Sequence, residues 1–334
     1  MNKQLEKKID KFTANKEALM KKYPSLDPQT AGYMNFLFLN QGKVLDREKL
    51  DDAENGLNIE SCSFDMPREV LKYVLLAEAA LSGDPAAFYD SMGKINTKIR
   101  AGKLFENGNE VLAAMILSGF AGEIDVDEAV KRVAKVLSEM NRDHPILTDR
   151  NDTVSAAALA LAYPDLTPRQ IADKVKECYK ILKKELDKRA ANGNELDRYL
   201  DESVLLRKDA PEFVNNEIQT AAAVVAGTEG DYAEKCGKVL EILGSLKDKG
   251  MSPKFGDGLS LLGALAALPK SAEEILTDLT GISAYLEGKP GYQDADDRLL
   301  DAAAFMLLQA PEDEASAFNS LISPAAMILL AAAR

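Results

Sequence analysis

The chain has 334 residues and is acidic, with 54 aspartates and glutamates against 41 lysines and arginines. This balance argues against nucleic acid or an anionic membrane as a partner, because phosphate binding needs clustered lysines and arginines. The three cysteines are far apart and lack metal-ligand spacing, which favours reduced thiols in the cytoplasm. We therefore expect a cytoplasmic protein that has no cofactor and binds neither nucleic acid nor a membrane.

Residues 1–60 are polar, and the sequence predicts that they form an N-terminal helical cap. Apolar residues recur there at roughly helical spacing: Leu5, Ile9, Phe12 and Leu19. The charged start of the chain lacks the apolar core of a signal peptide. The polar stretch from Asp51 to Ser63 contains Gly56 and is predicted to be a loop that separates this cap from the rest.

From residue 61 to 334, blocks of small and aliphatic residues recur, and charged amphipathic stretches follow them. Five blocks begin at steps of 43, 64, 41 and 40 residues, with the polar residues Asn109, Asp152, Asn216, Asp257 and Asp297. A period of about 40 residues is typical of paired-helix repeats, whose units cannot bury their apolar faces alone. The long step indicates an insertion at about 191–214.

The amphipathic stretches carry helix start and stop signals. Thr167 precedes Pro168, and Ser271 with Glu274 fits a capping box. Gly250 and Gly288 are predicted to end two helices in the left-handed conformation. Strand patterns are nearly absent. The sequence thus predicts an all-α array of helical hairpins, α-solenoid-like, with a hydrophobic C-terminal helix. The alternative is a closed α/α toroid with the apolar helices as its inner ring.

The longest apolar run, from Pro324 to Ala333, is too short to cross a bilayer, which needs ~20 residues.

The only histidine, His144, lies in the stretch Asp143-His144-Pro145-Ile-Leu-Thr148-Asp149. An imidazole beside a carboxylate can act as a general base near neutral pH. It can equally stabilise the last carbonyls of the preceding helix, which Pro145 would end. Both interpretations stay open, and no catalytic residue is assigned.

Polar residues precede each apolar helix, and helix capping explains them. In a repeat array, however, equivalent loops stack along one edge, beside a row of helix N-termini that favour anions. A ligand site at this edge would use His144, Thr148, Asp149, Asp152, Asn216 and Gln219.

The densest group of carboxylates is Asp294-Ala-Asp296-Asp297-Arg-Leu-Leu-Asp301. Its spacing resembles the aspartate-rich motif of prenyl-transferring helical enzymes without matching it closely, and no second metal motif accompanies it. Calcium-loop spacing also fails. We expect no metal, and the candidates for one would be Asp296, Asp297 and Asp301.

The stretch His144-Pro-Ile-Leu-Thr-Asp-Arg-Asn-Asp-Thr-Val-Ser-Ala-Ala-Ala-Leu-Ala resembles the His-Pro-Phe-Leu-Thr…Asp…Ala-Leu-Leu-Ala signature of a bacterial family, the domain of unknown function 4003 type. Asn216-Glu-Ile-Gln219 is similar to the Asn-x-Leu-Gln step of that family. The family's following Ser-His-Ile-Leu is Ala-Ala-Val-Val here, so its second histidine is missing. The resemblance implies an all-helical cytosolic bacterial protein and no particular activity.

Two functions remain open. The first is a scaffold that binds a protein or peptide of basic or neutral charge along a groove. The second is a small-ligand-binding protein or enzyme, with its site at the loops before the apolar helices around His144. A deep pocket joining those loops would favour the second function, and an extended groove would favour the first.

Overall fold

The computed structural model describes most of the chain, namely residues 3–40, 46–57, 69–101, 108–143, 152–191, 210–228, 230–251 and 258–308. These residues form fourteen helices and no strand, which confirms the all-α prediction. None of the described helices combines the length and the apolar composition that a membrane span requires. The predicted hydrophobic C-terminal helix lies outside the described residues.

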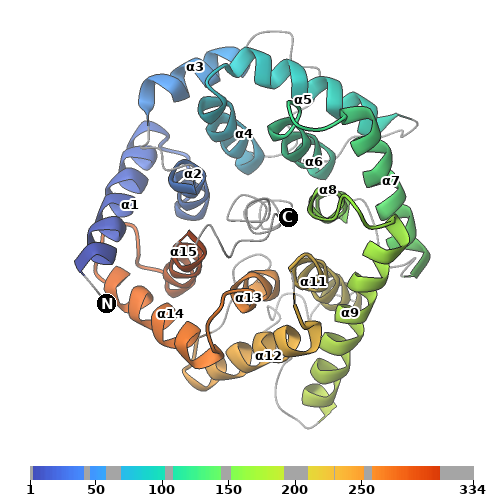
Figure 1. The fold of residues 1–334 in the computed structure, drawn as a ribbon. Helices are drawn as coiled ribbons and strands as arrows, with labels where there is room; N and C mark the ends of the chain where they lie inside the picture. Colours follow the sequence, from blue (N-terminus) through green and yellow to red (C-terminus); the bar gives the residue numbers. More distant parts are fainter. Residues whose placement is uncertain are drawn as a thin grey trace.

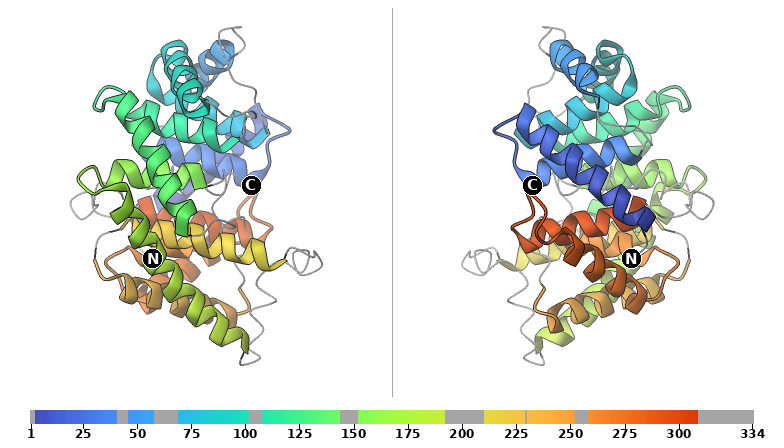
Figure 2. Two further views of the ribbon diagram at one scale, coloured as in Figure 1. Left: turned by 90° about the vertical axis from the view of Figure 1, so that its right-hand side faces the viewer. Right: turned by 90° about the vertical axis from the view of Figure 1, so that its left-hand side faces the viewer.

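The helices alternate along the chain between the outer and the inner layer of a closed ring, which Figure 1 shows down its axis. The outer helices are α1 (Lys3–Lys22), α3 (Arg47–Leu57), α5 (Pro85–Arg100), α7 (Val126–Asp143), α9 (Pro168–Ala191), α12 (Tyr232–Asp248) and α14 (Ala272–Leu286). The inner helices are α2 (Pro28–Asn40), α4 (Glu69–Ser82), α6 (Gly108–Gly119), α8 (Asp152–Ala162), α11 (Ala210–Ala226), α13 (Gly258–Ala266) and α15 (Ala295–Leu308). Figure 2 shows the same layers from two sides.

The first and last hairpins close the ring. The Phe12 ring of α1 lies 4.7 Å, between centroids, from both Phe36 of α2 and Phe305 of α15. On the surface, the Asp10 carboxylate of α1 accepts a hydrogen bond of 2.7 Å from the Lys289 ammonium, which follows α14. An open solenoid would keep these hairpins apart. The predicted solenoid is therefore corrected to the closed toroid, which the sequence left as the alternative.

The helices of residues 1–60 take places in this ring. The loop predicted from Asp51 to Ser63 is wrong for residues 51–57, which belong to α3; Leu50 and Ala53 give that helix a buried face despite its polar composition. The division into a cap of residues 1–60 and an array of residues 61–334 stays a prediction. Of the predicted insertion, residues 210–214 belong to α11, and residues 192–209 lie outside the described part of the chain.

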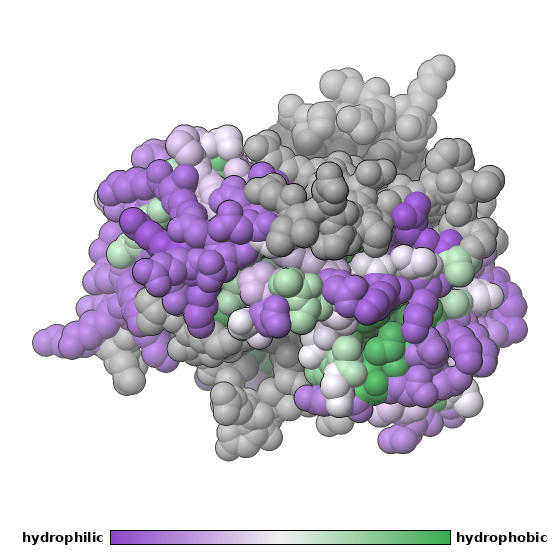
Figure 3. Space-filling view, turned by 90° about the horizontal axis from the view of Figure 1, so that it is seen from above, coloured by the Kyte–Doolittle hydropathy of each residue, from purple (hydrophilic) through white to green (hydrophobic). Residues whose placement is uncertain are grey.

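Inner and outer helices differ in burial as the sequence pattern predicts. Every residue of α8 from Asp152 to Ala160 is buried, whereas α7 buries only Val133, Val136 and Met140. The small side chains of the inner helices let their backbones approach one another: a Cβ on Gly263 of α13 would lie 3.4 Å from the Ala221 carbonyl oxygen of α11. The face of the outer wall that Figure 3 shows is mostly hydrophilic, with small apolar areas between the polar side chains.

The predicted caps are confirmed. Ser271 and Glu274 form the capping box at the start of α14. The Thr167 hydroxyl and the Gln170 side chain cap the start of α9, which begins at Pro168. Gly250 and Gly288 have φ values of 68° and 82°, in the left-handed region that a side chain disfavours.

The outer layer holds the C-terminal ends of the inner helices by a contact that recurs at equivalent positions. Arg132, the seventh residue of α7, donates from Nε to the Ala160 carbonyl at 3.2 Å, and also to the carbonyls of Tyr163 and Leu166. Lys238, the seventh residue of α12, donates to the carbonyl that follows α13 at 3.2 Å. Carbonyls left over at a helix end are satisfied in this way.

The two ends of the ring are built from different connections. Each hairpin returns the chain, so all inner helices run in one direction and all begin at the same end (Figure 1). The chain passes from inner to outer helices through short turns, such as Gly83 and Asp84 between α4 and α5. Apart from the short segment 23–27 before α2, the segments that lead into inner helices are longer: 58–68, 101–107, 144–151, 192–209, 249–257 and 287–294.

Candidate functional site

Buried polar side chains of the inner helices gather near the helix starts. Most lie within about two turns, or ~7 residues, of the first residue of the helix. The buried polar residues of the inner helices in this region are Thr30, Asn109, Glu110, Asp152, Thr153, Ser155, Ser260, Asp297 and Asp301. Farther along the inner helices, the buried polar residues among the described side chains are Asn35 and Gln219. The ring therefore has one polar end inside, and it is the end that the sequence predicted for a site.

Two of the predicted site residues are in contact there. The Gln219 amide of α11 donates from Nε2 to Asp152 Oδ2 of α8 at 3.0 Å, across 67 residues of sequence. The two side chains are buried, with exposed fractions of 1% and 6%. Asp152 is the first residue of α8, where the helix dipole stabilises a carboxylate. A hydrogen bond to a carboxylate is also stronger than one between neutral groups.

Three buried hydroxyl groups lie near the starts of inner helices, two of them on α8 beside Asp152 and one on α13. The Oγ atoms of Ser155 and Ser260 and the Oγ1 atom of Thr153 are buried and make no hydrogen bond to the described residues. Ser155 lies three residues after Asp152, so it shares a face of α8 with that carboxylate. Each such hydroxyl costs about 1–3 kcal/mol, because burial removes its hydrogen bonds to water. These groups are therefore available to bind a polar partner.

The other predicted ligand residues are not placed. His144, Thr148 and Asp149 fall in the segment 144–151, outside the described residues, and Asn216 lies in α11 with its side chain outside the description. The Asp143 carboxylate next to His144 is occupied: it accepts hydrogen bonds from Arg169 at 2.5 Å and Lys176 at 2.7 Å of α9.

The pKa of Asp143 reflects this pairing. Burial alone would raise the pKa, but the hydrogen bonds from Lys176 and Arg169 outweigh it and hold the pKa below the ordinary value. The carboxylate thus anchors α7 to α9 in its charged form.

The carboxylates proposed for a metal have other surroundings. Asp301 Oδ2 accepts from Lys16 Nζ of α1 at 2.8 Å and from the Tyr292 hydroxyl at 2.6 Å. The Lys16 ammonium also lies 4.3 Å from the centre of the Tyr292 ring, a cation–π contact. Within the described ranges, no three His, Cys, Asp or Glu side chains are arranged to hold a metal ion. Asp301 serves the closure of the ring instead.

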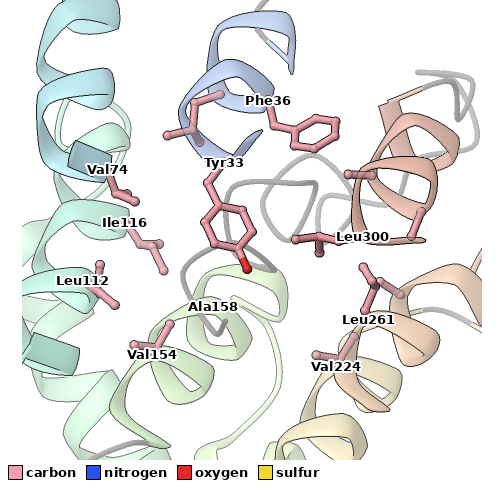
Figure 4. Close-up of a cluster of buried hydrophobic side chains, with 14 of the residues drawn as sticks. Tyr33, Phe36, Val74, Leu112, Ile116, Val154, Ala158, Val224, Leu261 and Leu300 are labelled. Atoms are coloured by element: carbon pink, nitrogen blue, oxygen red, sulfur yellow. The ribbon is translucent and has the colours of Figure 1, made fainter. Parts of the chain in front are cut away.

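Sequence reasoning missed Lys16, Tyr292 and Tyr33. Nothing in a charged N-terminal segment marks Lys16 as buried. Tyr33 of α2 points toward the axis of the ring (Figure 4), and burial, together with the charges of nearby Asp301 and other carboxylates, raises its pKa above the ordinary value. A tyrosine hydroxyl within the mostly apolar stretch Ala31–Leu39 is the signal that could have found it.

These features define a class of protein: a closed ring of helical hairpins whose inner helices start at a buried polar end. The chain belongs to a family of proteins of unknown function, DUF4003, whose model matches residues 27–214. The match runs from α2 into the start of α11 and includes His144 and Asp152, so the resemblance seen in the sequence is confirmed. No curated protein and no solved structure matches the chain.

Proposed function

We propose that the protein binds a small polar molecule at the end of the ring where the inner helices begin. The observation that supports this most is the buried hydrogen bond between Asp152 and Gln219. The two residues belong to separate hairpins, and the sequence predicts both as residues of a ligand site. Polar side chains are seldom buried unless they find a hydrogen-bond partner, and here the partner comes from another hairpin.

The chemistry of the ligand follows from the groups at this end. The hydroxyls of Thr153, Ser155 and Ser260 can donate hydrogen bonds. The carboxylates of Asp152 and Glu110 can accept them. A ligand that fits carries both donors and acceptors, as a sugar, a polyol or an amino acid does. A simple anion would meet the carboxylates, which repel it, and a simple cation would meet the hydrogen-bond donors, which it cannot use.

The closed ring makes the scaffold hypothesis the less supported of the two. In an open solenoid, the inner helices offer a groove to a peptide. Here these helices face their own axis, so a protein or peptide partner would have to use the outer wall. A catalytic role for His144 and a cytoplasmic location remain predictions, since neither has support from the described residues.

The test is thermal melting of the full chain with a panel of sugars, polyols, amino acids, nucleotides and divalent metals. A ligand at a hundred times its Kd stabilises the folded state by about 2.7 kcal/mol, which raises the melting temperature. We expect a shift with one class of small polar molecule. The absence of a shift with every class at millimolar concentration would contradict the proposal.

Two variants assign the site. Asp152→Asn keeps the shape of the side chain but removes its charge, and should abolish the shift while the ligand-free protein still melts cooperatively. The matched control is Asp165→Asn, an exposed carboxylate in the turn after α8, which should keep the shift. A shift that survives Asp152→Asn unchanged would put the ligand elsewhere.

A further inference from the structure

Two cysteines meet where the outer helices α9 and α12 pack against each other. Cys178 lies near the middle of α9 and Cys236 in the second turn of α12, and both are free thiols with no exposed surface. The Cys236 thiol donates to the Cys178 carbonyl oxygen at 3.9 Å, across 58 residues of sequence. The Cys178 thiol donates in turn to the Cys236 sulfur. The contact therefore joins two helices of the outer wall that belong to different hairpins.

This arrangement is the one that a disulfide requires. The bond forms only between cysteines whose side chains face each other, since the sulfurs must come within about 2.05 Å. Two thiols that already share a hydrogen bond need only a change in side-chain torsion and a small shift of the helices to reach that distance. A buried cysteine that served only as core would have no need of a second cysteine as its neighbour.

The contact also makes the two thiols unequal. The hydrogen bond with Cys236, together with burial, raises the pKa of Cys178. The same hydrogen bond stabilises a Cys236 thiolate and lowers the pKa of Cys236, although burial opposes this. Cys236 is therefore the thiol that loses its proton first, and the thiolate is the form that reacts with an oxidant.

We propose that Cys178 and Cys236 are a modification site at which hydrogen peroxide forms a reversible disulfide between α9 and α12. The Cys236 thiolate attacks one peroxide oxygen, the O–O bond breaks, and hydroxide leaves and takes up the thiol proton as water. The Cys178 sulfur then attacks the sulfur of the Cys236 sulfenic acid. The S–O bond breaks, and hydroxide leaves with the Cys178 proton as a second water. Two thiols and one peroxide thus give one disulfide and two waters.

Burial selects the kind of oxidant. Thiol–disulfide exchange needs a bulky disulfide such as oxidised glutathione to reach one of the sulfurs, and neither sulfur is accessible. Hydrogen peroxide is small and uncharged, so a brief local opening is enough to admit it. Helix ends open more readily than helix centres, and Cys236 is the fifth residue of α12. The site is distinct from the proposed ligand site, and either can fail without the other.

Peptide mapping of the full chain tests the bond directly. The folded protein is treated with hydrogen peroxide, the remaining thiols are alkylated, and the peptides are analysed by mass spectrometry without reductant. We expect a linked pair of peptides that contain Cys178 and Cys236, and its loss after treatment with dithiothreitol. Oxidised glutathione at the same concentration should give less of this pair. Both cysteines recovered as alkylated thiols after peroxide, or faster linkage by oxidised glutathione, would overturn the proposal.

Thermal melting of the same samples gives a second measurement. A disulfide between residues so far apart restricts the unfolded chain, so peroxide should raise the melting temperature and dithiothreitol should reverse the rise. Cys178→Ala and Cys236→Ala should each abolish the rise, whereas the matched control Cys62→Ser should keep it. A rise of the same size in Cys178→Ala would contradict the inference. If either alanine variant does not fold, the peptide map of the unchanged chain decides.

Discussion

Lys16 and Asp301 form a buried ion pair that joins the first and last hairpins of the ring. Their atoms Nζ and Oδ2 are 2.8 Å apart, with exposed fractions of 2% and 1%, across 285 residues of sequence. Taking two charges out of water is costly, and their attraction offsets this cost only when geometry and further hydrogen bonds are good. Tyr292 supplies such a bond. The pair thus specifies that α1 and α15 meet at the seam, the place where the first and last hairpins of the ring join.

Removal of one partner should destabilise the ring strongly. Lys16→Met leaves the Asp301 carboxylate buried without a cation, and we expect the free energy of unfolding to fall by about 3–5 kcal/mol. Urea unfolding followed by circular dichroism measures this change. The double variant Lys16→Met with Asp301→Leu should recover much of the loss. A double variant no more stable than Lys16→Met would contradict an uncompensated charge as the cause.

Gly32 should not tolerate a side chain. A Cβ at this position of α2 would lie 2.7 Å from Asp301 Oδ1, closer than van der Waals contact allows. Gly32→Ala should therefore lower the free energy of unfolding by about 1–3 kcal/mol. The matched control is Gly281→Ala in α14, where a Cβ meets nothing within 4 Å. That change should stabilise the protein by roughly 0.5–1 kcal/mol, and changes of the same sign in both variants would be evidence against the clash.

Arg132 should be a stability residue of the wall. Arg132→Met removes the donors to the carbonyls of Ala160, in the last turn of α8, and of Tyr163 and Leu166, which follow it, and about 1–3 kcal/mol of stability should be lost with them. Lys131→Met, an exposed neighbour on the same helix, serves as the control and should melt close to the unchanged chain. Equal melting temperatures for the two variants would show that water replaces Arg132 without cost.

The contribution of Asp143 should depend on pH. Its pKa is lower in the folded chain than its ordinary value of 3.8, so its pairing stabilises the fold above pH 3.8 and is lost as the pH falls through the folded pKa. Asp143→Asn should therefore reduce stability at pH 7. The difference between the two proteins should shrink below pH 4, as measured by chemical unfolding at pH 7, 4 and 3. A difference that is constant with pH would exclude the charge of Asp143 as its source.

Local signals in the sequence predicted the local structure well. The helix start predicted at Thr167 and Pro168 is found, and Ser271 caps as expected, because both depend on neighbouring residues only. Closure of the ring could not be derived in this way. It depends on Lys16 and Asp301, which are far apart in the chain and have no shared local pattern. The error over Asp51–Leu57 has a similar cause, since tertiary burial of Ala53 overrides a polar composition.

The candidate site was predictable in part. Asp152 and Gln219 stand out because each is a polar residue beside an alanine-rich stretch. A polar residue in such a stretch is buried together with the helix that carries it. Their hydrogen bond could not be predicted, since it depends on how far α11 extends past the start of α8. Tyr33 was missed because an aromatic residue in a mostly apolar stretch looks like ordinary core.

The closed ring also bears on how the chain folds. Hairpins in an open array can form one after another, each on its neighbour, but a ring must also bring Phe12 against Phe305. Contacts between residues so distant in sequence slow folding, because the entropy of a very long loop is lost before the contact forms. An unfinished arc would expose the aromatic edges of both its terminal hairpins. Two such arcs could then join each other in place of closing, so the seam is where exchange of hairpins between copies would begin.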